Sequence, residues 1–421
     1  MTRRPLRPGP ATGRFHHAGP DAFTTAILAL VLLGAGAGGQ ATLHGQVAGV
    51  EFRDSAGITL VLNPETPVGG PGGWRVTERP ALRIGVLDGR PEETFSGVFH
   101  GTVLADGRII VANTNPIEAR VFDSMGRHLV SFGREGRGPA EFIGRISQVT
   151  LAEPDTVGLR NGRLGVHLFL ADGSFLRTVP GSIQSGVYDW LGHGRFLLRT
   201  AIRTAEPPEV GVIHLADRYS IWSAETQRED TLGVFSGIDQ YRNGEAGTIP
   251  TVIPYGRRTF TAFGAGRVYV AYNAAYSIQV FSVDGSLERV IRKRYRPLAV
   301  SAEDRDAGVR RALQGPLFRA PLPDQILAGL ERQVREAPIP DTHPAFEELV
   351  VDRVGFLWVR SPSPTGAAQV RWDVFSPEGI LTATVAVPAV WRVLEIGEDY
   401  LLAVSRDDYE VEYVEMYGIR R

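Results

Sequence analysis

The sequence predicts an all-β fold built from repeated four-stranded units, and three observations lead to this prediction. Residues 101–142 contain four short apolar runs, TVLA, RIIVAN, ARVFD and HLVSFG, separated by turns rich in Gly and Asp. A hairpin with Phe four residues before Gly recurs along the chain. The copies at Phe122 and Phe169 are 47 residues apart, the length expected of one propeller blade. Together these observations predict a β-propeller.

The recurring hairpin has a physical reason for each of its two fixed residues. Glycine allows the positive φ that a tight hairpin turn needs. Phenylalanine supplies a large apolar face that one sheet can press against the next. The four copies begin and end at Phe122–Gly126, Phe169–Gly173, Phe281–Gly285 and Phe375–Gly379.

Six strands can be aligned as the innermost strand of a blade. Each is followed by a second apolar strand, and the unit around residues 195–235 is the least regular. The six are GTVLAD (101–106), QVTLAE (148–153), YDWLGH (188–193), FTAFGA (260–265), ELVVDR (348–353) and RVLEIG (392–397). The sequence therefore predicts a six-bladed β-propeller over residues 81–421.

An N-terminal strand is expected to close the ring. The last unit ends after its third strand, residues 409–419, so residues 82–87 are predicted to supply the missing outer strand. Such closure removes the exposed sheet edges that invite aggregation. Residues 42–80 are predicted to form an N-terminal extension with one strand, residues 57–63.

A helical insertion at about residues 301–337 separates blades 4 and 5. Ser301 with acidic residues after it is a partial helix-start signal. Residues 323–336 place four apolar side chains on one helical face: Ile326, Leu327, Leu330 and Val334. Phe281 and Phe375 are 94 residues apart, so a seventh blade is an alternative, but the helical pattern favours six.

The N-terminus reads as an export signal. Four arginines precede an apolar run at residues 22–33, and small residues follow it. This predicts a signal peptide over residues 1–41, and an uncleaved signal anchor is the alternative. The run is short for a membrane span, which needs about 20 residues. We therefore expect an exported protein, periplasmic or extracellular, with no stable membrane span after cleavage.

Composition narrows the classes of partner and chemistry. The formal net charge is −2, so nothing global favours nucleic acid, and we expect a monomer. The chain has no cysteine, which excludes disulfides and thiolate chemistry. Lys293 is the only lysine among 45 basic residues.

The repeated features resemble the six-bladed β-propellers of the NHL-repeat type, in particular an exported bacterial group. The resemblance rests on LADGRIIVAN, on the Phe–Gly hairpin and on FGREGRGPAEF at residues 132–142, and it covers about residues 82–420. It implies a fold more than a function, since such propellers include binding scaffolds, lactonases and lyases. The irregular third blade and the helical insertion depart from the family's minimal repeat.

Two sets of residues are the candidate ligand-binding site. In a propeller the inner strands converge on a central channel, and five candidates lie near the starts of those strands: His100, Gln148, Asp189, Glu348 and Arg392. A second set lies at equivalent positions after three second strands: Arg160, Arg199 and Arg360. These arginines suit an acidic ligand. Hydrated channel lining and salt bridges between blades are the alternative interpretations.

Motifs for catalysis are weak. The sequence contains no G-x-S-x-G and no H-E-x-x-H. Gly133, Gly136 and Gly138 lead into a strand and not a helix, so a turn between blades is favoured over a phosphate-binding loop. The basic run at residues 289–296 lies on an outer strand, where charge solvates the edge.

The sequence therefore predicts a non-enzymatic binding or scaffold module for a peptide, protein or glycan. The alternative is a metal-dependent hydrolase or lactonase, because related propeller lactonases hold a divalent cation with Glu, Asn and Asp side chains in the channel. Asp189 and Glu348 would then be ligands, although Arg392 would repel a cation. A structural subunit of an envelope assembly is a third possibility. The sequence does not decide whether the protein is an enzyme or whether it binds a cofactor or a metal ion.

Overall fold

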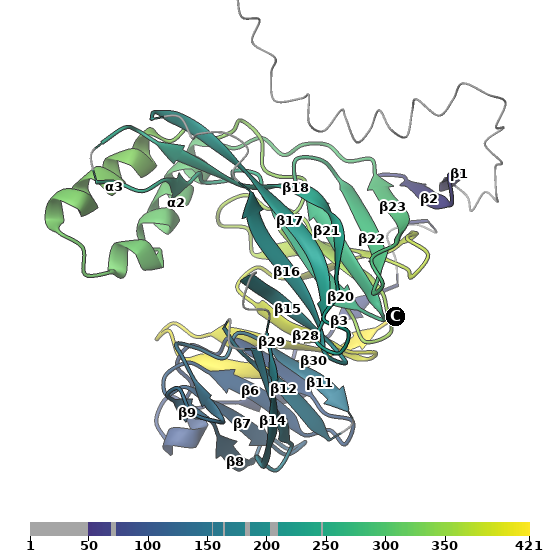
Figure 1. Ribbon diagram of the computed structural model, residues 1–421, viewed down its shortest axis with the longest axis vertical. Coiled ribbons are helices and arrows are strands. Elements are labelled where there is room, and N and C mark those ends of the chain that lie inside the picture. The colour runs from purple at the N-terminus through teal and green to yellow at the C-terminus, as the bar shows by residue number, and fades with distance from the viewer. Residues whose placement is uncertain are drawn as a thin grey trace, which may run out of the picture.

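The computed structural model describes residues 49–68, 73–153, 155–162, 165–181, 186–202, 209–245 and 247–421. The export signal predicted for residues 1–41 lies outside these residues. Strands predominate in the part described, and two α-helices interrupt them (Figure 1). Within this part, no helix is long and apolar enough to cross a membrane.

The first three large sheets follow one another along the chain, each with its strands in sequence order. The first contains β5 (His100–Val103), β6 (Ile109–Asn113), β7 (Glu118–Phe122) and β8 (His128–Phe132). The second contains β11 (Val149–Glu153), β12 (Thr156–Asn161), β13 (Gly165–Leu170) and β14 (Phe175–Pro180). The third contains β15 (Gly186–Gly192), β16 (Arg195–Ile202), β17 (Gly211–Ser223), β18 (Glu229–Arg242) and β19 (Thr251–Val252).

Of the remaining three large sheets, the fourth and the sixth recruit strands from the N-terminal region. The fourth contains β20 (Thr259–Gly264), β21 (Arg267–Tyr272), β22 (Ser277–Ser282) and β23 (Leu287–Lys293), with β2 (Ile58–Asn63) and β1 (Glu51–Ser55) added outside β23. The fifth contains β24 (Glu348–Val351), β25 (Leu357–Arg360), β26 (Gln369–Phe375) and β27 (Leu381–Pro388). The sixth contains β28 (Arg392–Ile396), β29 (Tyr400–Arg406) and β30 (Glu412–Arg420). Two N-terminal strands, β4 (Leu82–Ile84) and β3 (Arg75–Val76), both pair with β30. A small pair, β9 (Arg134–Glu135) and β10 (Glu141–Phe142), follows the first sheet.

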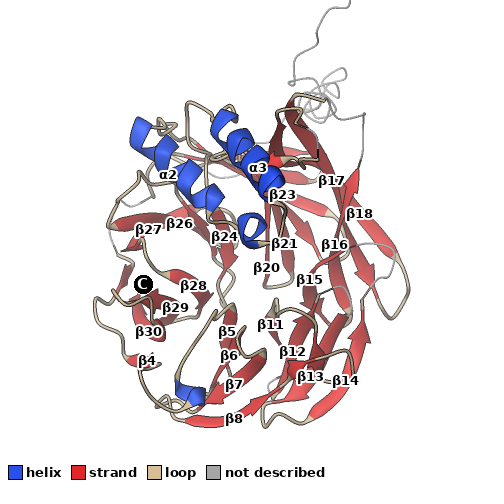
Figure 2. Cartoon of the chain, turned by 90° about the vertical axis from the view of Figure 1, so that its left-hand side faces the viewer, coloured by secondary structure: helices blue, strands red, loops and turns tan. Residues whose placement is uncertain are grey.

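The sheets are arranged around a common centre, as a β-propeller requires. Figure 2 shows the first strand of each large sheet, β5, β11, β15, β20, β24 and β28, nearest to that centre. Strand β5 contacts both β11 and β28, and β24 contacts both β20 and β28. The predicted all-β propeller fold is therefore confirmed.

In the described part of the chain, the core contains six apolar clusters, each between two neighbouring sheets. The recurring phenylalanines contribute to four of them. Phe122 packs between the first and sixth sheets, Phe169 between the first and second, Phe281 between the third and fourth, and Phe375 between the fourth and fifth. None of the four is more than 2% exposed. Each sheet is thus held to its neighbours mainly by buried apolar area.

The recurring glycines adopt the positive φ that a tight hairpin turn requires. Gly126, Gly173, Gly285 and Gly379 have φ between 81° and 92°. A residue with a Cβ would be strained at this φ. The four Phe–Gly hairpins are therefore confirmed as tight turns between the third and fourth strands of their sheets.

The outer edge of the sixth sheet is supplied by the N-terminal region, as predicted. Strand β4 pairs antiparallel with β30, with Ile84 opposite Val414 and Leu82 opposite Met416. The strand is shorter than the predicted range 82–87. A second short strand, β3, pairs with β30 at Ile419 and Arg420.

The N-terminal extension differs from the single strand predicted for it. Strands β1 and β2 form a hairpin, and β2 runs parallel to β23 on the outside of the fourth sheet. The buried side chain of Asn63 completes the attachment. It donates to the carbonyl oxygen of Gly379 (2.9 Å) and accepts from the amide of Leu381 (2.8 Å), so the extension joins the fourth sheet to the fifth.

The predicted helices are present between β23 and β24, in the interval that a seventh sheet would have needed. Helix α2 (Ala302–Leu313) begins with a capping box in which Ser301 and Asp304 exchange hydrogen bonds. Buried Asp304 also accepts from the amide (2.7 Å) and hydroxyl (2.8 Å) of Thr365, in the loop that joins β25 to β26 of the fifth sheet. A short 3-10 helix, η2 (Pro316–Arg319), lies between α2 and α3, and another, η1 (Pro91–Glu93), lies between β4 and β5.

Helix α3 (Asp324–Glu336) lies against the third sheet. Its contacts are with β18, which is 14 residues long, and with the short strand β19. The buried amide of Gln333 donates to the carbonyl oxygen of Ile249 (2.8 Å). Arg332 makes two hydrogen bonds of 2.7 Å to the carboxylate of Glu245. The insertion is thereby fixed to both the third and the fifth sheets.

Candidate functional site

The predicted site residues lie at one end of the six sheets. Glu348, at the start of β24, pairs with Arg360 at the end of β25. His100 and Arg392 likewise open β5 and β28. The amide of Arg160 donates to the carbonyl oxygen of Gln148 at the same end of the second sheet. The helical insertion leaves β23 and rejoins the chain at β24 on this side, so we call it the helix face. The opposite side, which carries the Phe–Gly hairpins, is the far face.

His100 lies between two arginines. Burial is the main cause that lowers its pKa to about 4, and the positive charges of Arg392 and Arg160 lower it further. The imidazole is therefore neutral at pH 7. Its Nδ1 is buried and has no hydrogen-bond partner among the described residues.

Asp189 is also buried and also feels the charge of Arg160, but its pKa shifts in the opposite direction to that of His100. Burial raises the pKa of its carboxyl to about 6, and the neighbouring charge of Arg160 opposes this rise. Arg160 thus acts on both His100 and Asp189, which come from the first and third sheets. Asp189 changes its protonation state close to neutral pH.

Glu347 and Glu348 share one arginine. The guanidinium of Arg360 is 3.7 Å from the carboxylate of Glu348 and 3.9 Å from that of Glu347. Burial raises the pKa of both carboxyls. The Glu348 side chain is nevertheless 36% exposed, so water reaches a carboxylate that lies deep among protein atoms.

The central cluster, as we call it, contains the charged groups linked by these interactions. Arg392 belongs to it, because its charge acts on both His100 and Glu348. The members are His100, Arg160, Asp189, Glu347, Glu348, Arg360 and Arg392. They come from the first, second, third, fifth and sixth sheets.

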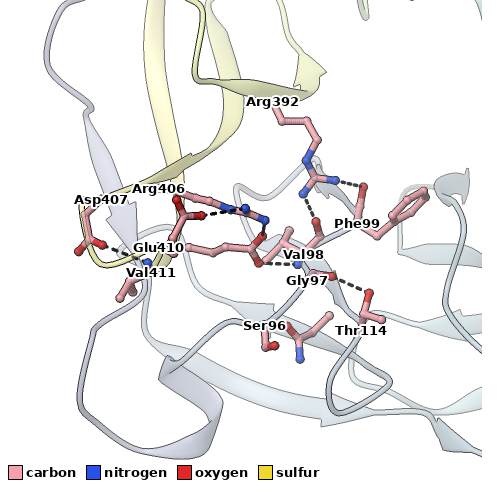
Figure 3. Close-up of polar contacts among 12 residues, drawn as sticks. Ser96, Gly97, Val98, Phe99, Thr114, Arg392, Arg406, Asp407, Glu410 and Val411 are labelled. Carbon is pink, nitrogen blue, oxygen red and sulfur yellow. Dashed lines mark hydrogen bonds and ion pairs between the residues drawn. The ribbon is translucent and has the colours of Figure 1, made fainter. Parts of the chain in front are cut away.

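Arg392 is held by the seam between the sixth and first sheets (Figure 3). Its guanidinium donates to the carbonyl oxygens of Phe99 (3.0 Å) and Val98. The amide of Val98 donates to the buried carboxylate of Glu412 (2.8 Å), which also accepts from Arg406 (2.8 Å). Much of the hydrogen-bonding capacity of Arg392 is therefore used to join two sheets.

Two predicted residues are engaged elsewhere. The side-chain amide of Gln148 accepts from the backbone N–H of Trp190 (2.9 Å) and donates to its carbonyl oxygen (3.2 Å). This joins the second and third sheets and leaves little of the amide for a ligand. Arg199 acts on Asp217 of the adjacent strand, where its charge opposes the rise in carboxyl pKa caused by burial.

Sequence reasoning missed four charged residues on this face. Glu347 directly precedes the predicted Glu348. Arg258 directly precedes β20, and its guanidinium lies 4.4 Å from the centre of the Phe260 ring. Arg145 lies 4.0 Å from the centre of the Phe99 ring, and Arg311 of α2 acts on Glu347. Positions just before each first strand could have revealed the first two.

The arrangement suits binding of charged or polar groups more than metal coordination. Within the described ranges, no three His, Asp or Glu side chains are grouped so that they could hold a metal ion. Asp189 and Glu348, the predicted alternative ligands, interact with different arginines, Arg160 and Arg360. The guanidinium groups can bind anions, and the carboxyl of Asp189, whose pKa is raised to about 6, can exchange a proton near that pH.

No family model matches the sequence, and no curated protein matches it. Solved structures do. A member of the DUF4221 family from Bacteroides vulgatus is 9% identical with a TM-score of 0.50, over 82% of this chain and 98% of that one. Regucalcin from Agrobacterium tumefaciens, a calcium-binding protein, is 13% identical with a TM-score of 0.35, over 85% and 96%. Virginiamycin B lyase from Staphylococcus aureus is 9% identical with a TM-score of 0.35, over 83% and 99%. At these identities the likeness concerns the fold alone.

Proposed function

We propose that this chain is an exported, closed six-bladed β-propeller of the NHL-like type that acts as a non-enzymatic binding module. Its ligand is a peptide, protein or glycan bound at the central cluster on the helix face. In this proposal residues 1–41 are the export signal, residues 42–80 an extension and residues 81–421 the propeller.

Closure of the ring is supported by the seam between the sixth and first sheets. Phe122, Leu402 and Val414 share one apolar cluster there. Glu412 and Arg392 add hydrogen bonds across the same seam. Apolar clusters occupy each of the other five junctions as well. These contacts are those expected of six blades with no open end.

The observation that carries the proposed site is the convergence of buried ionisable groups from five sheets. Burial and mutual charge shift the pKa values of His100, Asp189 and Glu348 in one region. Perturbed groups gathered in this way mark functional sites more often than chance. Propeller stability does not require them, because the apolar clusters already join the sheets.

A binding role is favoured over catalysis by the surroundings of His100. A general base is normally oriented by a carboxylate and placed next to a nucleophile. Here the positive charges of two arginines act on the imidazole, and its Nδ1 has no hydrogen-bond partner among the described residues. This environment favours a neutral imidazole that is not oriented through Nδ1 by a carboxylate.

Binding to defined arrays of peptides, proteins and glycans tests the proposal. Glu348→Gln keeps the shape of the side chain and removes its charge. We expect it to change the affinity of the tightest binder by about tenfold, whereas the matched control Glu288→Gln, in β23 on the far face, leaves binding unchanged. If every binder tolerates Glu348→Gln, the ligand does not bind at the central cluster.

The metal-dependent alternative has a separate test. Raised carboxyl pKa values at Asp189 and Glu348 are compatible with acid–base chemistry, and a cation there would lower them again. Elemental analysis of the purified mature chain, before and after chelation, is expected to find no tightly bound ion. One ion per chain that is lost in Asp189→Ala or Glu348→Ala would favour the hydrolase and justify an ester and lactone screen.

A further inference from the structure

Two exposed arginines on the helix face are stacked on aromatic rings. The guanidinium of Arg145 lies 4.0 Å from the centre of the Phe99 ring, and that of Arg258 lies 4.4 Å from the centre of the Phe260 ring. Stacking fixes the plane of a guanidinium and leaves the N–H groups at its edge free to bind. Within the part of the chain that the structure describes, neither arginine forms an ion pair.

These arginines approach the centre from opposite sides. Phe99 directly precedes β5 of the first sheet, and Phe260 lies in β20 of the fourth. Figure 2 shows β5 and β20 across the centre from each other. A third exposed arginine, Arg311, comes from α2, and its charge acts on Glu347 of the central cluster. Three exposed cations therefore come from elements next to the central cluster.

Among the charged residues named in and around the central cluster, cations outnumber carboxyls. In the central cluster, three arginines face three carboxyls. Arg145, Arg258 and Arg311 add three positive charges that no carboxyl of the cluster balances. The whole chain, by contrast, carries a formal net charge of −2. A local excess of cations on an otherwise slightly acidic protein attracts an anionic partner and repels a cationic one.

We propose that the helix face binds an acidic peptide, whose carboxylates pair with Arg145 and Arg258 while the chain of the peptide crosses the central cluster. This inference rests on the proposed binding function and names its ligand class. The arginine fork matches a carboxylate in a bidentate pair. An acidic glycan fits less well, because guanidinium groups already occupy the aromatic faces on which a sugar ring would stack.

Fluorescence anisotropy with two labelled peptides tests the inference. The probe is (Gly-Glu)₆, and the matched neutral peptide is (Gly-Gln)₆. We expect the acidic peptide to bind at least about tenfold more tightly, and Arg258→Ala or Arg145→Ala to weaken it by about tenfold. Raising the salt concentration should weaken binding further, because these arginines are exposed.

The chain offers matched controls on the far face. Arg127 and Arg228 lie in hairpins there and are 77% and 75% exposed. Arg127→Ala and Arg228→Ala change the net charge equally, and we expect less than about a twofold effect. Equal losses in these controls would show that only the overall charge matters and would overturn the inference.

Other outcomes separate the ligand class from the site. If (Gly-Gln)₆ binds as tightly as (Gly-Glu)₆ and still depends on Arg258, the acidic class is wrong and the proposed site stands. If an oligogalacturonate binds more tightly with the same dependence on Arg258, the ligand is a glycan. If (Gly-Glu)₆ fails to bind at about 1 mM, the acidic-peptide inference is wrong, and the array test of the proposed function is unaffected.

Discussion

At the residue scale, the central cluster contains two groups whose titrations oppose each other. The pKa of His100 is lowered from 6.5 to about 4, so its contribution to stability is present above pH 6.5 and is lost as the pH falls toward 4. The pKa of Asp189 is raised from 3.8 to about 6, so its contribution is present below pH 3.8 and is lost as the pH rises through 6. In the native chain the two slopes partly cancel between pH 4 and pH 6.

Removing one group should reveal the slope of the other. We expect Asp189→Asn to stabilise the protein more at pH 7 than at pH 4, because the native carboxyl must ionise in a buried position. Urea denaturation at both pH values measures the difference. Asp408→Asn, in an exposed loop, is the control. If Asp189→Asn changes the free energy of unfolding equally at pH 4 and pH 7, the carboxyl of Asp189 does not have a raised pKa.

The only lysine of the chain is buried between the fourth and fifth sheets. Its Nζ is 2.6 Å from the carboxylate of Asp373, which also accepts from the hydroxyl of Tyr276 (2.8 Å). We expect Lys293→Met to lower the free energy of unfolding by about 3 kcal/mol or more, since it leaves a buried carboxylate without its cation.

Two variants control this prediction. Arg294→Met removes an exposed cation from the adjacent position, and we expect a change of less than about 0.5 kcal/mol. Lys293→Met combined with Asp373→Asn should recover part of the loss, because the buried negative charge is gone. If Lys293→Met costs no more than Arg294→Met, the pair does not stabilise the fold.

At the element scale, local pattern predicted most of the fold. The alternation of apolar residues located the first strand of every large sheet, and Gly126 and its equivalents located the hairpins. The apolar stripe of residues 323–336 located α3. What the sequence could not predict depends on non-local pairing. Strand β2 joins β23 in parallel across more than 200 residues, and no local signal specifies that partner.

The same distinction applies to the site. The position just before or at the start of each first strand predicted His100, Glu348 and Arg392 as candidates near the centre. It could not show that the side-chain amide of Gln148 is hydrogen-bonded to the backbone of Trp190. Nor could it show that Arg145, from a loop after the first sheet, stacks on Phe99.

The attachment of β2 depends on Asn63. The side chain is 2% exposed and serves as both donor and acceptor for the backbone of the fifth sheet. We expect Asn63→Ala to lower the free energy of unfolding by about 2–4 kcal/mol, because the buried N–H of Leu381 and the carbonyl of Gly379 lose a partner. Asp54→Ala, an exposed change in the same hairpin, should have little effect. Equal effects in urea denaturation would mean that β2 is not anchored in this way.

At the scale of the whole molecule, the proposed closure of the ring depends on the seam between the sixth and first sheets. Buried Glu412 accepts hydrogen bonds from Val98 of one side and Arg406 of the other. Exposed Glu410 pairs with the same Arg406 (3.1 Å) but does not cross the seam. Comparing substitutions of these two glutamates therefore separates the contribution of the seam to stability from that of surface charge.

We expect Glu412→Ala to lower the free energy of unfolding by about 2–4 kcal/mol, and Glu410→Ala by less than about 0.5 kcal/mol. The buried amide of Val98 loses its acceptor only in the first variant. Urea denaturation monitored by tryptophan fluorescence gives both values. Similar losses in the two variants would show that this seam does not hold the ring closed.

The central claim is that a ligand binds at the central cluster on the helix face. Hydrogen–deuterium exchange of the mature chain, with and without the tightest ligand from the arrays, tests it most directly. We predict slower exchange at the starts of β5, β20, β24 and β28, where His100, Arg258, Glu348 and Arg392 lie. Protection confined to the far-face hairpins, such as residues 123–127 and 224–228, would contradict the claim.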